Sequence, residues 1–151
     1  MLEAAYERSA KIDGISQLTR EEKVLAVERV RTADGQPVIY SRDRIPARLL
    51  TDDLDLESLD PSLFALLRSS GHAADHATAT LKAVPSTNRT AKVLGVRRGK
   101  PVLYIEEINY DRNGRPVMVS REWHVSEAFD MRINRRPNQR RTCRTASGLL
   151  V

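Results

Sequence analysis

Apolar and polar positions follow the same order in two stretches of the chain, and both stretches predict paired strands. Residues 28–43 align with residues 107–122 at an offset of 79. The two copies carry Asp34-Gly35 and Asn113-Gly114, and each has a proline two residues after the glycine. Such dipeptides between alternating apolar residues are strong hairpin signals, because the tight turn needs positive φ angles. The sequence therefore predicts two related β-hairpins.

The similarity continues upstream of both hairpins. Residues 10–15 resemble residues 91–96 at an offset of 81, and each segment predicts a short helix that ends at a glycine. Before the second helix, residues 77–84 are rich in small and β-branched side chains, which favours a strand. At the same offset its counterpart falls before Met1. The chain is therefore predicted to begin one strand late.

A further helix is predicted between the two halves, over residues 60–71. Asp60 suits the N-cap, Pro61 the first helical position and Gly71 the C-terminal stop. Leucines at 63, 66 and 67 share one face. A bend at 126–128 and a final strand over 129–135 complete the expected elements. The fold class is α+β, with a mostly antiparallel sheet made from two repeated helix-hairpin units and helices packed on it.

Composition limits the class of protein. The chain has 151 residues, enough for one domain, and its 40% hydrophobic and 30% charged content is typical of folded proteins. No apolar run approaches the roughly 20 residues that span a bilayer, and no secretion signal is present at Met1. A single cysteine, Cys143, excludes an internal disulfide. We expect a cytoplasmic protein without membrane contact.

The positive charge is concentrated at one end. The net charge is +5, but six arginines follow Met131 with no acidic residue among them, and removing them leaves 19 basic against 20 acidic residues. Residues 137–151 are therefore expected to be a basic, disordered tail behind a domain over residues 1–136. Nothing in that near-neutral domain resembles a nucleic-acid surface.

Enzyme and metal signatures are scarce. The sequence has no phosphate-binding loop, no nucleophile elbow and no Cys-x-x-Cys pair. His72 and His76 could share a metal on a helix, but on a strand they would lie about 13 Å apart. We expect no metal, no cofactor and no catalytic residue.

The hairpin strands carry the most informative polar residues. Residues two apart on a strand share a face, so Arg29 and Arg31 point the same way. Two guanidinium groups on one face could bind a phosphate or carboxylate. Equally, they could pair with Asp43 or Glu122 on a wet sheet face. Ser62 has the same two interpretations, as an anion ligand at a helix start or as a helix cap.

An ordered series of motifs resembles a known family. The series is Arg29-x-Arg31-x-x-Asp-Gly-x-Pro37, Ile45-Pro46, Ser62-Leu63-Phe64, Leu94-Gly95-Val96-x-x-Gly99-x-Pro101-Val102 and Asp111-x-Asn-Gly-x-Pro116. Over roughly residues 4–136 it is similar to the UTRA domain, the effector-binding half of GntR-superfamily transcription regulators of the HutC subfamily.

This resemblance implies a chorismate-lyase-like fold, an effector pocket and a homodimer. It also implies that DNA is contacted only through a winged-helix domain that precedes this one and is absent here. In sugar-phosphate-responsive relatives, the positions of Arg29, Arg31 and Ser62 hold the phosphate, so the effector is expected to be a sugar phosphate or carboxylate. Phe64 replaces the family's tyrosine and Ser41 replaces a frequent glutamate, which argues against an amino-sugar ligand.

Ten residues are the candidates for effector binding. They are Arg29, Arg31, Ser41, Asp43, Ser62, Phe64, Tyr110, Ser120, Glu122 and His124. The expected function is small-molecule sensing and dimerisation in a bacterial transcription regulator. Two alternatives remain open at this point: a chorismate-lyase-like enzyme acting on a carboxylated substrate, and a dimerisation module with a degenerate pocket.

Overall fold

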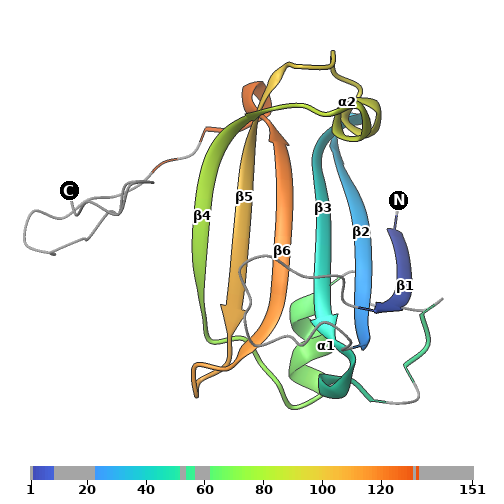
Figure 1. Ribbon diagram of the computed structural model, residues 1–151, viewed down its shortest axis with the longest axis vertical. Coiled ribbons are helices and arrows are strands. Elements are labelled where there is room, and N and C mark those ends of the chain that lie inside the picture. Colours follow the sequence, from blue (N-terminus) through green and yellow to red (C-terminus); the bar gives the residue numbers. More distant parts are fainter. Residues whose placement is uncertain (1, 9–22, 52–53, 57–61, 131, 133–151) are drawn as a thin grey trace, which may run out of the picture.

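Six strands form one antiparallel sheet in the computed structural model (Figure 1). The structure describes residues 2–8, 23–51, 54–56, 62–130 and 132. The strands lie in the order β1-β2-β3-β6-β5-β4. Their bounds are β1 Leu2–Arg8, β2 Lys23–Ala33, β3 Gln36–Pro46, β4 His76–Pro85, β5 Pro101–Tyr110 and β6 Pro116–Val125. The predicted α+β class with a mostly antiparallel sheet is confirmed.

Two α-helices cover opposite faces of this sheet. Helix α1 (Leu63–Ser69) packs on Leu25 and Val27 at the lower end of the sheet in Figure 1. Helix α2 (Asn88–Leu94) packs with Tyr40 and Val30 at the upper end. Odd and even positions of β2 point to opposite sides, so we call these the α1 face and the α2 face. Short 3-10 helices η1 (Ala47–Leu49) and η2 (Ser126–Ala128) follow β3 and β6.

The two hairpins are related by an approximate two-fold axis through the middle of the sheet. In the central β3–β6 pair, Arg42 lies opposite Arg121, and these two residues are equivalent in the repeat. Ser41 lies opposite Glu122 and Asp43 lies opposite Ser120 in the same ladder. The internal repeat predicted for residues 36–43 and 115–122 is thus reproduced by the sheet.

The alignment upstream of the turns is wrong by one residue. Arg29 pairs with Ser41, and Glu107 pairs with Ser120, the equivalent of Ser41. The sheet therefore matches Arg29 with Glu107, whereas a constant offset of 79 matched it with Ile108. The shift changes which side chains of β5 point to the α1 face.

Unequal turns cause this shift. Four residues, 33–36, separate the paired residues Thr32 and Pro37, whereas five, 111–115, separate Tyr110 and Pro116. The Asp111 carboxylate organises the longer turn by accepting hydrogen bonds from backbone N–H groups two and four residues on, at 2.8 and 2.9 Å. Both turn glycines have the expected positive φ, 77° in the first hairpin and 73° in the second.

The expectation of a missing first strand is also wrong. Strand β1 pairs antiparallel with β2 and places Leu2 opposite Arg29, just as β4 places Ala79 opposite Glu107. Strand β1 is therefore the counterpart of β4. The offset of 81 could not be carried upstream, because the connections differ in length and residues 2–8 contain no β-branched side chain. The helix predicted over residues 10–15 lies outside the described residues.

Helix α1 begins later than predicted. Its N-cap is Ser62, with φ −95° and ψ 99°, and the Ser62 Oγ accepts a hydrogen bond from the Ala65 N–H at 3.3 Å. Asp60, the predicted cap, and Pro61 lie outside the described residues. A serine hydroxyl reaches the third helical N–H as well as a carboxylate does, so the start could shift to Ser62. The predicted buried leucine face of the helix is confirmed.

The final strand predicted over residues 129–135 does not form where the structure describes this segment. The bend at 126–128 is present as η2, but Phe129, Asp130 and Arg132 have no strand structure. Strand β6 already has β3 and β5 as neighbours, so the chain that follows β6 finds no free edge there. The other residues of this prediction lie outside the described part.

Candidate functional site

Seven of the ten candidate residues lie together on the α1 face, on three neighbouring strands. The ladders bring Arg29, Ser41 and Glu122 into one row and place Asp43 beside Ser120. Together these residues form a polar band between the α1 core and the upper end of the sheet. We call them the polar cluster: Arg29 and Arg31 from β2, Ser41 and Asp43 from β3, and Ser120, Glu122 and His124 from β6.

A buried ion pair forms the inner part of the cluster. The Arg29 Nη2 lies 2.6 Å and its Nε 3.2 Å from the same carboxylate oxygen, Oδ2 of Asp43. The Ser41 hydroxyl donates to that oxygen as well, at 3.3 Å. The Asp43 side chain is only 1% exposed. Of the two open interpretations of Arg29, the structure therefore supports internal pairing with Asp43.

A looser pair forms the outer part. The Arg31 Nη1 lies 4.0 Å from the Glu122 Oε1, and the Arg31 side chain is 52% exposed. That separation is too long for a hydrogen bond. The other oxygen of Glu122, Oε2, lies 2.8 Å from the His124 Nε2, and the His124 ring makes an edge contact with Phe129. Arg31 and Glu122 are thus close enough to attract each other electrostatically but too far apart to form a hydrogen bond.

Neighbouring groups keep Glu122 ionised. The hydrogen bond with His124 is the largest cause that lowers the pKa of the Glu122 carboxyl, and the charges of Arg31 and Arg29 act in the same direction. Partial burial opposes them by disfavouring the charged form. The net shift is downward, so Glu122 presents a carboxylate at neutral pH.

Two residues of the α1 face were not predicted. Glu107 lies opposite Ser120, and Asn109 follows two residues further along the same side of β5. Within the described chain, the Asn109 Nδ2 and the Asp43 Oδ1 are buried and have no hydrogen-bond partner. The repeat alignment with an offset of 79 placed Ile108 rather than Glu107 at the position of Arg29, so it predicted that Glu107 and Asn109 point to the other face. Predicting them correctly would have required the length of the second turn.

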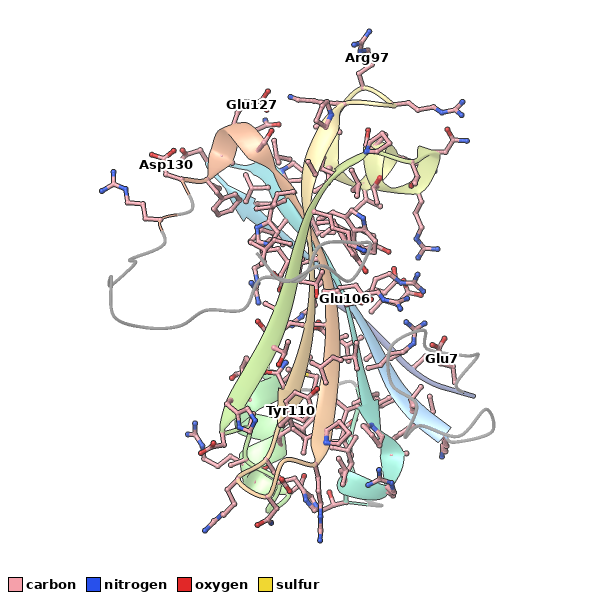
Figure 2. All side chains as sticks on the ribbon, turned by 60° about the vertical axis from the view of Figure 1, so that its left-hand side comes forward. Glu7, Arg97, Glu106, Tyr110, Glu127 and Asp130 are labelled. Carbon is pink, nitrogen blue, oxygen red and sulfur yellow. The ribbon has the colours of Figure 1, made fainter. Side chains whose placement is uncertain are left out.

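The remaining three candidates lie elsewhere. Ser62 and Phe64 belong to the start of α1, where Ser62 caps the helix and Phe64 is 46% exposed. Tyr110 stacks on His76 at the end of β5, with ring centroids 5.3 Å apart. Figure 2 shows Tyr110 near the lower end of the sheet, far from Glu127 and Asp130, which follow β6 at the upper end. Tyr110 is therefore not brought to the polar cluster.

The α2 face has a hollow of about 610 Å³ between β2 and α2. Three of its lining residues are bonded to one another: Glu28 accepts from the Tyr40 hydroxyl at 2.7 Å and from Arg89 at 2.6 Å, and Arg89 also donates to the Tyr40 hydroxyl at 3.0 Å. Burial raises the pKa of Glu28, but these hydrogen bonds outweigh it and the net shift is downward. The hollow lies on the α2 face and the polar cluster on the α1 face, and Arg29 of β2 belongs to the lining of the hollow as well as to the cluster.

The chemistry available at the polar cluster is reversible ion pairing and hydrogen bonding. It offers guanidinium donors, carboxylate acceptors, hydroxyls and one imidazole. Among the described residues, no group of three or more histidine, cysteine or carboxylate side chains is placed to hold a metal ion. No helix in this part of the chain is long and apolar enough to cross a membrane.

The sequence model of one protein family, described as the UTRA domain, matches residues 5–130. Solved structures with the same fold include the ligand-binding domain of a GntR-family transcriptional regulator from Bordetella bronchiseptica. It is 24% identical, with a TM-score of 0.79, over 89% of this chain and 87% of that one. A GntR-family regulator from Enterococcus faecalis is 26% identical, with a TM-score of 0.75, over 89% of this chain and 96% of that one.

A longer structure is similar as well. PhnF from Mycobacterium smegmatis is 22% identical, with a TM-score of 0.80, over 91% of this chain and 62% of that one. The similarity therefore extends over almost the whole of this chain but over less than two thirds of PhnF.

Proposed function

Because this chain belongs to the UTRA domain family, we propose that it is the effector-binding domain of a bacterial GntR-family transcription regulator, of the HutC subfamily. The observation that carries the proposal is the polar cluster. It gathers the Arg-x-Arg motif of β2 with polar residues of β3 and β6 on one face of the sheet. Ionic and hydrogen-bonding groups partly withdrawn from water suit recognition of a small polar metabolite.

The polar cluster is a better candidate than the hollow on the α2 face. In the hollow, Glu28, Tyr40 and Arg89 satisfy one another. In the cluster, Arg31 is half exposed and forms no hydrogen bond with another described residue, and the Asp43 Oδ1 is buried without a partner. Groups that lack partners gain most from a ligand.

Arg31 is the group that meets an anionic part of the effector. Its guanidinium is 52% exposed, whereas Arg29 is 14% exposed and is already bonded to Asp43. A guanidinium can donate two parallel hydrogen bonds to a phosphate or a carboxylate. Ser62 caps α1 outside the polar cluster, so its role as a further ligand of the anion stays a prediction from the family resemblance.

The domain works as part of a larger regulator. We propose that it forms a homodimer and that a separate winged-helix domain contacts the DNA, so the regulator acts in the cytoplasm. Effector binding changes DNA binding only to the extent that the effector prefers one arrangement of the dimer over another. A chorismate-lyase-like enzyme finds no support among the similar proteins, since the Bordetella bronchiseptica and Enterococcus faecalis structures are both described as transcriptional regulators.

A screen followed by one variant pair tests the proposal. Thermal shift would be measured against phosphosugars, amino acids and carboxylates, and the best hit titrated by calorimetry. Arg31→Ala should weaken that hit about ten- to hundredfold, because charge-assisted hydrogen bonds contribute about 1.5–3 kcal/mol. Arg97→Ala is the control, since Arg97 projects from the upper tip of the molecule (Figure 2). Equal affinity in both variants, or chemical turnover of the hit, would overturn the proposal.

A further inference from the structure

We propose that the polar cluster takes a zwitterionic effector, which carries an ammonium or similar cationic N–H group close to its anionic group. This inference rests on the proposed function and narrows it. An Arg-x-Arg pair by itself predicts a ligand that carries only negative charge. The residues that surround the pair in the folded chain argue against such a ligand.

The first observation is the charge of the site. Two guanidinium groups, Arg29 and Arg31, share the α1 face with two carboxylates of the cluster, Asp43 and Glu122. Glu107 adds a third carboxylate to the same face, opposite Ser120. Apart from His124, this surface thus carries three carboxylates against two guanidinium groups. A ligand with negative charge alone would be repelled by these carboxylates as well as attracted by Arg31.

The second observation is the open pair at the exposed side of the cluster. Arg31 and Glu122 are 4.0 Å apart and share no hydrogen bond, and the Glu122 Oε1 is left to that loose contact while Oε2 is held by His124. Each group therefore keeps hydrogen-bonding capacity for a ligand. A zwitterion can satisfy both at once, with its anion on Arg31 and its ammonium on Glu122.

The third observation points to the same chemistry from deeper in the site. The Asp43 side chain is 1% exposed, and its Oδ2 receives all three hydrogen bonds from Arg29 and Ser41. Its Oδ1 is buried and has no partner in the part of the chain that the structure describes. A buried carboxylate oxygen without a donor is costly. A ligand N–H is the partner that it lacks.

Three small probes with one carbon skeleton test this inference on the 151-residue chain. They are O-phosphoethanolamine (zwitterion), ethyl phosphate (anion) and ethylamine (cation), each titrated while the side-chain N–H signal of Arg31 is followed by NMR. O-phosphoethanolamine should shift this signal at a concentration at least about tenfold lower than either of the others, the effect of one extra charge-assisted hydrogen bond. Glu122→Gln should remove the preference, whereas Arg97→Ala should keep it.

The outcomes separate the inference from the proposed function. If ethyl phosphate binds as tightly as O-phosphoethanolamine, the zwitterion is refuted and an anion-sensing domain remains. The same holds if Glu122→Gln folds and leaves the preference intact. Should Glu122→Gln lose its native spectrum, Glu107→Gln serves in its place and should reduce the preference. If no probe moves the Arg31 signal up to about 50 mM, well above the millimolar range of weak ligands, both proposals fail.

Discussion

The two arginines of the Arg-x-Arg motif have different tasks, although they lie two residues apart on one face of β2. Arg29 is 14% exposed and bonded to a carboxylate that is 1% exposed. Arg31 is 52% exposed and has only a loose ionic neighbour. We therefore expect Arg29 to contribute mainly to the fold and to the placement of Asp43, and Arg31 to contribute mainly to the proposed effector binding.

This division predicts opposite effects of two alanine substitutions on stability. Arg29→Ala leaves the Asp43 carboxylate buried without its cation, which should lower the free energy of unfolding by about 3 kcal/mol. Arg31→Ala removes an exposed side chain and should change it by less than about 0.5 kcal/mol. Urea unfolding at neutral pH measures both values. Similar losses in the two variants would contradict the division.

The ionised state of Glu122 predicts a pH-dependent contribution to stability. The pKa of Glu122 is lowered in the fold from an ordinary value of 4.5, chiefly by His124. Its stabilising effect is therefore complete above that value and is lost as the pH falls through the lower folded pKa. The charged groups that face it are Arg29 and Arg31 from β2 and His124 from its own strand.

Glu122→Gln, which cannot ionise, should reveal this contribution. At pH 7 the variant should be less stable than the wild type by about 1 kcal/mol, and the difference should shrink toward pH 3. Urea unfolding at several pH values between these limits gives the profile. A difference that stays constant over the whole range would mean that the Glu122 charge does not stabilise the fold.

At the scale of the elements, short sequence motifs correctly predicted the turns and helix ends whose geometry depends on neighbouring residues. The Asp34-Gly35 turn forms with positive φ at both residues, and Gly95 ends α2 in the left-handed conformation. The alternation along β2, β3 and β6 also predicted which candidate side chains share a face. These features depend on neighbours in the sequence, so they could be inferred from the sequence alone.

Features that depend on long-range pairing could not be inferred in the same way. Strand β1 has no β-branched residue, and its strand structure depends on pairing with β2. The extra residue in the second turn moves Glu107 onto the α1 face. Whether Arg29 would bond to Asp43 or remain open was undecided, because the alternation gives the face but not the distance.

At the scale of the whole molecule, the repeat has diverged where the two units meet. The approximate two-fold axis relates Arg29 to Glu107 and Asp43 to Glu122. One unit thus supplies the cations of the α1 face, and the other supplies only acidic or neutral groups at the matching positions. A symmetric repeat would carry two identical half-sites, whereas this divergence fits the proposed single site, which would distinguish the two ends of a ligand.

The sheet also has one conspicuous edge. Strand β4 pairs only with β5, and nearly all of its residues are exposed. It is ten residues long, and between its first residue, His76, and its last, Pro85, the only charged side chain is Lys82. Natural edge strands are usually protected by charges, prolines or bulges. Leu81 is 44% exposed on this strand, which indicates a surface suited to a further strand.

Because we propose that the domain forms a homodimer, we predict that a second copy of the chain pairs with this edge. Antiparallel pairing of β4 with β4 is self-complementary under two-fold symmetry and would join two sheets into one. Leu81→Lys should then weaken the dimer, because it places cations on both sides of the seam. Ala5→Lys on the opposite edge strand, β1, is the matched control and should leave the dimer intact. Analytical ultracentrifugation over a concentration series decides the matter: a monomeric wild type, or an equally stable Leu81→Lys dimer, would exclude β4 as the dimer interface.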